Sequence, residues 1–409
     1  MDLAAAVFRE KSRLRSFLEH LGVVKDPRDV RRVAHPLREV LLLVVCATLA
    51  DCDDYDHMAE WGENHLSFLR DLLPYDFGVP SGRWLTLLMN RINPALFSGA
   101  FTSWVRATWP DRPELVAIDG KTSRRSHDRA QGRGPLHLVS AFATTSGLVL
   151  GQEAVEGKTN ELSAIPVLIE RLAENNGLKG ALVSIDAIAT NAAVAAKITD
   201  AGADYLLAVK GNQPTLRAEV ESLFSSQALV GEDCVVDWDK GHGRIERRAV
   251  SVVRQTDWLD GDRRFPGEFR LPNAATIIRV QSRAELSDRT RMETRYYISS
   301  AVLTAQKAAD AVRGHWGIEN RLHWVLDVTF AEDQSRLRKG HGATNMAIVR
   351  HFAINLIRHA PEPVRAPKPN WPRKSSKPLK PRATSLRLRR KIAGWRTDYL
   401  NAVLQISAR

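Results

Sequence analysis

The sequence predicts an α/β protein with a helical amino-terminal domain, a mixed-sheet core and an antiparallel β insertion. Apolar residues recur at helical spacing through 1–110. Strand and helix patterns alternate in 111–230, and β-branched, alternating segments punctuated by Gly and Pro fill 231–302. Helical spacing returns in 303–360, and a basic, Pro-rich tail, 361–409, completes the chain.

Composition excludes several classes of protein. The chain has 409 residues, 44% of them hydrophobic, which suffices for a large core and for two or three domains. The three cysteines, Cys46, Cys52 and Cys234, form no Cys-x-x-Cys motif, so neither a zinc site nor a disulfide framework is predicted. The start has no secretory pattern, and the longest apolar run, 40–50, is too short to span a membrane. We therefore expect a cytoplasmic protein.

Most of the net charge of +12 lies near the carboxyl end. Residues 361–391 contain eleven Lys or Arg and one acid, Glu362, and so carry +10. We expect 361–382 to stay unfolded and to contact a phosphate backbone, and 386–404 to form a last helix. The alternative is a solvated linker that only keeps the protein soluble.

Helices are predicted in the amino-terminal domain from apolar spacing over 8–21, 37–50, 58–72 and 84–92. The second is apolar on most faces and is therefore expected to be buried. The acidic turn that follows it, 51–57, lacks the Gly that an EF-hand loop requires, so we interpret it as a helix-capping loop and not as a cation site.

The core is predicted from the order strand, strand, strand, helix, strand, helix, strand. Its strands are 115–118, 136–143, 148–155, 181–185 and 205–209, with helices after Ser163 and through 194–201. A crossover through the first helix can make the strands before Asp119 and Asp186 parallel neighbours. Both carboxylates would then lie at one edge of the sheet, close enough to share a metal ion. The alternative is that each Asp only forms a turn or caps a helix.

The insertion is predicted as antiparallel strands over 234–238, 245–253, 275–280 and 294–299. Helical patterns follow at 304–326 and 345–358. The first of these helices carries a third acid, Glu319.

Two features of the helix around Glu319 bear on its chemistry. Gly314 and Gly317 weaken it and predict a break or the close approach of another backbone. On an unbroken helix His315 and His323 would lie one turn either side of Glu319. For both histidines we favour packing or DNA contact over metal ligation.

The order Asp119, Asp186, Glu319, with a β insertion before the Glu, resembles the DDE transposases of bacterial insertion sequences, and among them the H-repeat-associated group. The resemblance covers roughly 13–360, and 387–404 looks like the family's end. The segments that carry it are 35–42, 117–126, 136–142, 203–213, 239–247, 294–300, 315–320 and 323–327.

The chain departs from this family at three places. Ala-Ile-Ala-Thr-Asn follows Asp186, where the family usually has Ala-Met-Gly-Cys-Gln. Pro80-Ser-Gly-Arg-Trp84 replaces the usual Pro-Ser-His-Asp-Thr, and the linker 361–382 is longer than usual.

The resemblance implies an RNase H-like core with two divalent cations, usually Mg²⁺ with Mn²⁺ as a substitute. Asp119 would bridge both metals, and Asp186 and Glu319 would each complete one. Cations about 3.5–4 Å apart can activate water or a 3′-hydroxyl and stabilise the leaving oxygen of a phosphodiester. The implied partner is double-stranded DNA, both element ends and target, bound by a homodimer or larger assembly in the bacterial nucleoid. Residues 1–110 would be the transposase-associated, DNA-binding domain.

Nine residues are candidate DNA contacts, because they are basic or polar and lie near the acids or in a Gly-rich turn: Lys121, Lys210, Asn212, Gln213, Lys240, His242, Arg244, Arg313 and Asn320. Each has a plainer reading. Lys121 could be an ordinary surface lysine, 210–213 a simple turn after a strand, and 240–244 a plain β-turn.

Alternatives remain for the third acid and for two tryptophans. Asp327 or Asp333 could replace Glu319 as the third acid. Trp316 and Trp324 could stack on a flipped base, although we favour core packing for both.

The resemblance implies the function of a transposase that binds terminal inverted repeats, cuts DNA and joins the 3′ ends to a target. One alternative is a metal-dependent nuclease of the same fold that cuts without joining. Another is a DNA-binding relative whose catalysis has decayed, although the presence of all three acids argues against it. Inverted repeats flanking the coding region would separate these readings.

Overall fold

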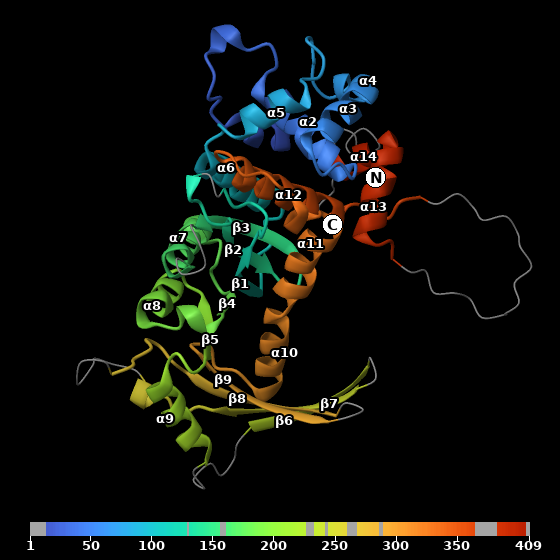
Figure 1. Ribbon diagram of the computed structural model, residues 1–409. Helices are drawn as coiled ribbons and strands as arrows, with labels where there is room; N and C mark the ends of the chain where they lie inside the picture. Colours follow the sequence, from blue (N-terminus) through green and yellow to red (C-terminus); the bar gives the residue numbers. More distant parts are fainter. Residues whose placement is uncertain are drawn as a thin grey trace, which may run out of the picture. The chain divides into compact units, whose positions relative to one another are not determined.

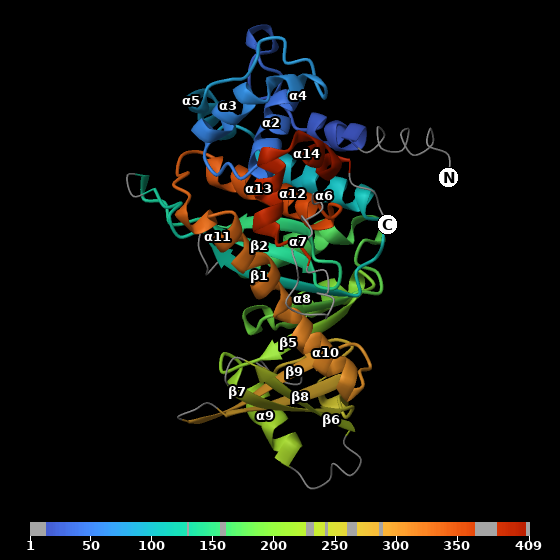
Figure 2. The same cartoon turned by 90° about the vertical axis from the view of Figure 1, so that its right-hand side faces the viewer.

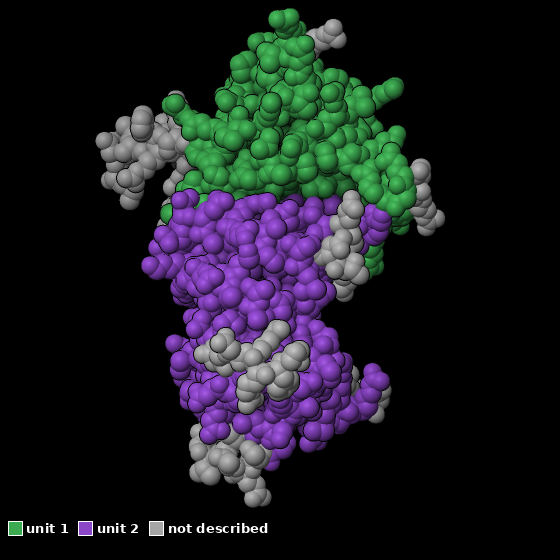
Figure 3. All heavy atoms as spheres, turned by 90° about the vertical axis from the view of Figure 1, so that its left-hand side faces the viewer, with its two compact units in different colours: residues 1–110, 123–133, 324–409 green, residues 111–122, 134–323 purple. Residues whose placement is uncertain are grey.

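The computed structural model describes residues 14–128, 131–155, 161–225, 233–241, 244–259, 268–285, 289–364 and 383–405. The chain forms two compact units, distinguished by colour in Figure 3. The first unit comprises 1–110, 123–133 and 324–409, and the second comprises 111–122 and 134–323. Within the described ranges no helix has the length and apolar character needed to cross a membrane.

The second unit is built on one mixed sheet. In the described residues it has nine strands in the order β3-β2-β1-β4-β5-β9-β8-β7-β6 (Figure 1). The strands are β1 Leu115–Thr122, β2 His137–Ala143, β3 Leu148–Val155, β4 Leu182–Ile185, β5 Asp204–Val209, β6 Asp233–Gly241, β7 Arg244–Val253, β8 Thr276–Glu285 and β9 Thr290–Ser299. The predicted order of strands and helices is confirmed, and β1 and β4 are parallel neighbours as predicted.

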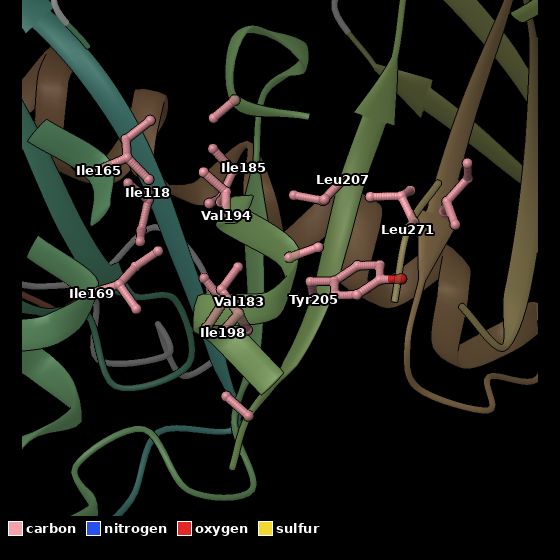
Figure 4. Packing of buried hydrophobic residues seen from close by; sticks show 14 of the residues in the cluster. Ile118, Ile165, Ile169, Val183, Ile185, Val194, Ile198, Tyr205, Leu207 and Leu271 are labelled. Carbon is pink, nitrogen blue, oxygen red and sulfur yellow. The ribbon is translucent and has the colours of Figure 1, made fainter. Parts of the chain in front are cut away.

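Helices cover both faces of this sheet. On one face lie α7 Glu161–Ala173, α8 Ala192–Asp200 and α9 Pro214–Ser225. Ile165 of α7 and Ile198 of α8 pack with Val183 and Ile185 of β4 (Figure 4). On the other face α10 Ala305–His315 packs against β1, β4 and β7 (Figure 2). Successive side chains of a strand point to opposite faces of the sheet, and helices cover both faces. Both sets of side chains in β1, β4 and β5 are therefore buried, which explains their nearly continuous apolar sequences.

β1 is longer than predicted. The apolar pattern ended at Ile118, but the strand continues to Thr122 because β2 pairs with it there in antiparallel register, Asp119 opposite Ser140. β4 ends at Ile185, so Asp119 lies on a strand whose parallel neighbour has just stopped.

The strands of the predicted insertion are antiparallel, as expected, but they do not form a separate sheet. β6 to β9 form consecutive antiparallel pairs, and β9 pairs with β5 through Leu207 and Ile298. The β insertion therefore extends the core sheet.

The helix predicted at 304–326 is broken, as its glycines indicated. α10 ends at His315, a π-helical turn (η7) spans Glu319–His323, and α11 spans Trp324–Thr329. A Cβ on Gly314 would lie 2.4 Å from Leu115 Cδ2, so a strand side chain, not a backbone, makes the close approach. Because of this break, His315 ends α10 while Glu319 and His323 lie in the π-helical turn, so the three side chains do not follow the spacing of one continuous helix.

The first unit is helical. A helix covers 14–22, and the others are α2 Leu37–Leu49, α3 Tyr55–Asn64, α4 Leu66–Arg70, α5 Gly82–Met89, α6 Pro94–Thr108, α11, α12 Gly342–His359, α13 Leu386–Trp395 and α14 Thr397–Leu404. Short 3₁₀ turns occur in this unit at Val30–Arg32 and Glu332–Gln334, and in the second unit at Glu174–Asn176, Ala187–Ala189 and Asp257–Leu259. α2 is buried on nearly every side, as predicted, because α3, α12 and α13 pack around it.

Several helix predictions in this unit need correction. The single helix predicted over 58–72 is two helices separated at His65, and the last helix is two helices separated at Arg396. α6, which sequence analysis did not identify, begins with Asn93 as its N-cap and Pro94 in its first turn. The capping role of the acidic turn is confirmed, because Asp54 Oδ1 accepts a hydrogen bond from the backbone N–H of His57 at 2.9 Å.

Candidate active site

The site begins with two aspartates on neighbouring parallel strands: Asp119 lies within β1, and Asp186 directly follows β4. Ile118 of β1 and Ile185 of β4 are register partners in a parallel pair. The residue after each is an aspartate, so Asp119 and Asp186 lie side by side where β4 ends.

Asp119 lies in a cluster of acids. Burial, the largest cause, and the charges of Glu319, Asp186 and Glu161 together raise its pKa to about 7, although a backbone hydrogen bond from Gly120 lowers it. His323 Nδ1 lies 3.7 Å from its Oδ2. The neighbouring negative charges favour the protonated form of the Asp119 carboxyl. A bound cation would offset the same repulsion, so it could take the place of the proton.

The pKa of Asp119 leads to a testable result for metal-free protein. The carboxyl ionises near 3.8 when unfolded but only near 7 in the fold, so its contribution to stability is complete below about pH 4 and is lost as the pH rises through 7. Asp119→Asn, which cannot ionise, should therefore exceed wild type in unfolding free energy at pH 8 in EDTA, by up to about 4 kcal/mol. Urea unfolding at pH 5 and pH 8 measures this. A difference that does not grow with pH would contradict the acid cluster.

The pKa of Asp186 is lowered, in contrast to that of Asp119. Burial raises its pKa, but hydrogen bonds from Lys210 and the backbone of Ala187, with the Lys210 charge, hold the pKa below its ordinary value. Lys210 Nζ lies 2.6 Å from Oδ1 and 2.9 Å from Oδ2 of Asp186. Lys210, predicted as a DNA contact, is thus an ion-pair partner of a candidate metal ligand.

Glu319 reaches this cluster from the π-helical turn that follows α10. Its side chain is exposed, and it acts on Asp119 through its charge. π-helical turns inside helices recur at functional sites because they redirect side chains. Of the two alternative acids, Asp333 already pairs with Arg124 at 3.4 Å and accepts a hydrogen bond from its backbone N–H at 3.3 Å.

His315 is buried against β4. Its Nδ1 lies 2.9 Å from Ser184 Oγ, and burial lowers its pKa, so it is neutral at pH 7. The contact with Ser184 agrees with packing, one of the two roles that we favoured over metal ligation, and the choice against ligation stays a prediction. For Trp316 and Trp324 we favoured core packing over stacking on a base. The expected core packing is wrong, because the two residues are 42% and 58% exposed. The Trp316 ring instead lies under the guanidinium of Arg295, 4.7 Å from its centroid.

The candidate DNA contacts fall into different environments. Lys121 is buried on β1, so it is not the surface lysine of the plainer reading. Asn212 donates a hydrogen bond from Nδ2 to Ala187 O at 2.9 Å, and Gln213 donates from Nε2 to the same carbonyl at 3.1 Å. Both therefore fix the turn after β5 to the loop that follows Asp186.

Of the remaining candidates, Arg313 lies on α10 and Asn320 in the π-helical turn. Arg313 pairs with Asp237 at 2.5 Å, and the exposed Asn320 donates from Nδ2 to Trp316 O at 3.2 Å. His242 lies outside the described residues, as do the side chains of Lys240 and Arg244.

A buried polar chain behind Asp119 was not identified from sequence. His137 Nε2 lies 2.6 Å from Glu161 Oε1, and His137 Nδ1 lies 2.8 Å from Thr122 Oγ1. A Cβ on Gly120 would lie 2.5 Å and 2.6 Å from the atoms of this His–Glu pair. The glycine in Asp119-Gly-Lys was a visible signal, because it permits this close approach, but nothing marked Glu161.

The carboxylates suit a hard divalent cation in chemistry. Among the residues that the structure describes, no group of three His, Cys, Asp or Glu is already close enough to hold a metal ion. The carboxylate oxygens of Asp119, Asp186 and Glu319 are nevertheless the type of ligand that Mg²⁺ or Mn²⁺ prefers. The acids repel one another, which contributes to the raised pKa of Asp119, and a bound cation would relieve that repulsion.

A cluster of carboxylates at the ends of parallel strands defines a candidate site for carboxylate-dependent, metal-assisted chemistry. Comparison with known proteins makes the class specific. The family described as "Transposase DDE domain" matches residues 110–356, and the family described as "DDE_Tnp_1-associated" matches 18–105.

Individual relatives agree. The chain is 37% identical over 348 residues to "H repeat-associated putative transposase YhhI" of Escherichia coli (strain K12), which covers 84% of this chain and 90% of the relative. It is 35% identical over 349 residues to "Putative transposase YncI" of Escherichia coli O157:H7, covering 84% and 88%. The chain belongs to the DDE transposase family, as its resemblance to the H-repeat-associated group indicated, and it is an enzyme of that family, whose members depend on divalent metal ions.

Proposed function

We propose that this transposase binds the terminal inverted repeats of its own insertion sequence, cleaves the DNA there and joins the 3′ ends to a target in the bacterial nucleoid. We assign catalysis to Asp119, Asp186 and Glu319 on an RNase H-like core. The observation that supports this most is the convergence of two strand ends and a π-helical turn on one carboxyl, Asp119, whose pKa the other two acids raise.

The cofactor that we propose is Mg²⁺, replaceable by Mn²⁺, held by these three acids with Asp119 shared. Such cations would supply activation of water or of a 3′-hydroxyl and stabilisation of the leaving oxygen.

The protein positions these groups. The parallel register of β1 and β4 sets the spacing of the aspartates, and the Ser184–His315 hydrogen bond ties the end of α10, just before Glu319, to β4. His323 lies beside Asp119, with its Nδ1 3.7 Å from Oδ2, a distance beyond that of a hydrogen bond.

DNA contact is proposed for the exposed side chains of Arg313, Asn320 and Asn212. It is also proposed for residues 240–244, between β6 and β7 in the sequence. We assign recognition of the element ends to 1–110, and we expect two or more copies to act together on DNA, since both ends must be joined.

Binding and cleavage can be separated by the choice of metal ion. With Ca²⁺ the protein should shift labelled element ends in a gel but cut them little, whereas Mg²⁺ or Mn²⁺ should produce nicks at the ends, because cleavage needs the tighter coordination of the smaller ions. A random duplex of equal length is the control. Zinc bound stoichiometrically through His315 or His323 would contradict an oxygen-only site.

The basic tail offers a second result. Two of the residues that contribute to the charge of +10 in the tail, Arg389 and Arg390, are buried in α13. The charge available to DNA therefore lies mostly in 365–382, a segment outside the described residues. Replacing the seven Lys and Arg of that segment with Gln should weaken binding to element ends and to random DNA by similar factors. The slope of log affinity against log salt should become shallower by about 0.9 per lost phosphate contact.

Gel shifts at several salt concentrations measure that slope. The substitution spares 361–364, where Glu362 pairs with Arg389 and Val364 O accepts a hydrogen bond from Arg396. α13 should therefore stay docked, and an unchanged slope would mean that the segment is only a linker.

A further inference from the structure

The ion pair between Lys210 and Asp186 places a cation on a carboxylate that is proposed to bind metal. The ammonium contacts both oxygens, at 2.6 Å and 2.9 Å. The Lys210 side chain is 56% exposed and that of Asp186 is 44% exposed. The pair therefore lies at the open side of the site, where a divalent cation and a DNA strand would arrive.

The backbone that carries Lys210 is fixed independently of this ion pair. Gln213 Nε2 donates to Ala187 O and to Thr190 O, both at 3.1 Å, and Asn212 Nδ2 donates to Ala187 O at 2.9 Å. The turn after β5 is thereby bound to the loop after β4 through side-chain amides. The Lys210 side chain can leave Asp186 without moving the strand ends.

A divalent cation would compete with the ammonium for this carboxylate, because the ammonium already contacts both of its oxygens. A divalent ion on Asp186 would repel an ammonium held on the same two oxygens. The Lys210 ammonium is carried at the end of a flexible four-carbon side chain, and lysine ammonium groups commonly bind phosphate. Once displaced, the Lys210 ammonium would lie within a side chain's length of the acids, where a DNA phosphate must pass.

We propose that Lys210 is the resident counter-ion of the metal-free site, which a divalent cation displaces from Asp186 and which then binds a DNA phosphate beside the acids. The inference rests on the proposed function, since it requires Asp186 to be a metal ligand. It makes metal binding and DNA binding mutually reinforcing: metal frees the ammonium for phosphate, and phosphate removes the competitor of the metal. By linkage, each ligand raises the affinity of the other by the same factor.

Metal binding without DNA tests the first half. Free Mn²⁺ is counted by electron paramagnetic resonance during titration of the full chain, as wild type, Lys210→Gln and Lys197→Gln. Lys197 is the matched control, because it forms an exposed ion pair with Glu170 on α7. Lys210→Gln should bind Mn²⁺ about 2- to 5-fold more tightly than wild type, in proportion to an exposed ion pair of about 0.4–1 kcal/mol. Lys197→Gln should match wild type.

DNA binding tests the second half. In EDTA, Lys210→Gln and wild type should bind a duplex with the same salt dependence, because Lys210 is held by Asp186. In Ca²⁺, the slope of log affinity against log salt should be steeper for wild type than for Lys210→Gln. The difference should be about 0.9, which corresponds to one phosphate contact. Thermal unfolding in EDTA verifies that both variants are folded.

The outcomes separate this inference from the proposed function. If Asp186→Asn lowers Mn²⁺ stoichiometry but Lys210→Gln leaves Mn²⁺ affinity unchanged, the counter-ion role is overturned and the metal site stands. Equal slopes for wild type and Lys210→Gln in Ca²⁺ would overturn the phosphate contact. Undiminished Mn²⁺ binding by Asp186→Asn would overturn both the inference and the assigned metal site.

Discussion

Asp119→Asn, Asp186→Asn and Glu319→Gln are each expected to reduce DNA cleavage by at least about 10³-fold, or about 4 kcal/mol of transition-state stabilisation. Each amide keeps the shape of its carboxylate but loses the charge that holds a divalent ion. Affinity for element ends should change little, because phosphate contacts elsewhere supply most of it. Cleavage of end-labelled duplex in Mg²⁺, with gel shifts in Ca²⁺, measures both quantities.

The matched control is Glu170→Gln, an exposed acid on α7 that pairs with Lys197. It should cleave like wild type. A Glu319→Gln protein that still cleaves would move the third acid to Asp327 or Asp333. Loss of end binding in step with cleavage would mean that the acids act through folding.

Arg390→Met is expected to destabilise the first unit by about 3–5 kcal/mol, because it removes one partner from a buried charge network. Arg390 is fully buried. Its guanidinium lies 2.9 Å from Asp53 Oδ1 and 3.2 Å from Asp51 Oδ1, donates from Nε to Thr48 O at 3.0 Å, and stacks 4.2 Å from the Phe330 centroid. Methionine fills similar volume but leaves these groups without their donor.

Arg387 is the control for that measurement, since it is exposed on the same helix. Arg387→Met should change the free energy of unfolding by less than about 0.5 kcal/mol. Urea unfolding gives the stability, and amide hydrogen exchange in α13 reports whether that helix undocks first. Equal effects of the two substitutions would show that Arg390 only fills space.

The positions of the candidate acids in the fold were predictable because they depend on local pattern and topology. An apolar run that ends in Asp, repeated once with a helix between, leads directly to parallel neighbours with adjacent carboxylates. Gly314 likewise signalled a break before Glu319, although sequence could not show that the turn after it would be π-helical.

Other features depend on tertiary pairing that leaves no local trace. β1 extends through Thr122 only because β2 pairs with it, and Glu161 meets His137 from a helix start that looks ordinary in sequence. Lys210 looked like a loop lysine until the fold placed β5 beside β4. Arg390 looked like part of a basic tail, yet its two acidic partners, Asp51 and Asp53, lie more than 300 residues earlier, in the turn after α2.

Strand transfer is the most direct test of the proposed function. Purified protein is incubated in Mg²⁺ with a labelled duplex that carries its own element end and with a supercoiled plasmid as target. We expect nicks at the 3′ end of the element followed by labelled products joined to the plasmid, none of which form with Asp119→Asn or with a scrambled end. Ends that are cut but never joined, under conditions where both ends are bound, would contradict the transposition mechanism and leave a nuclease.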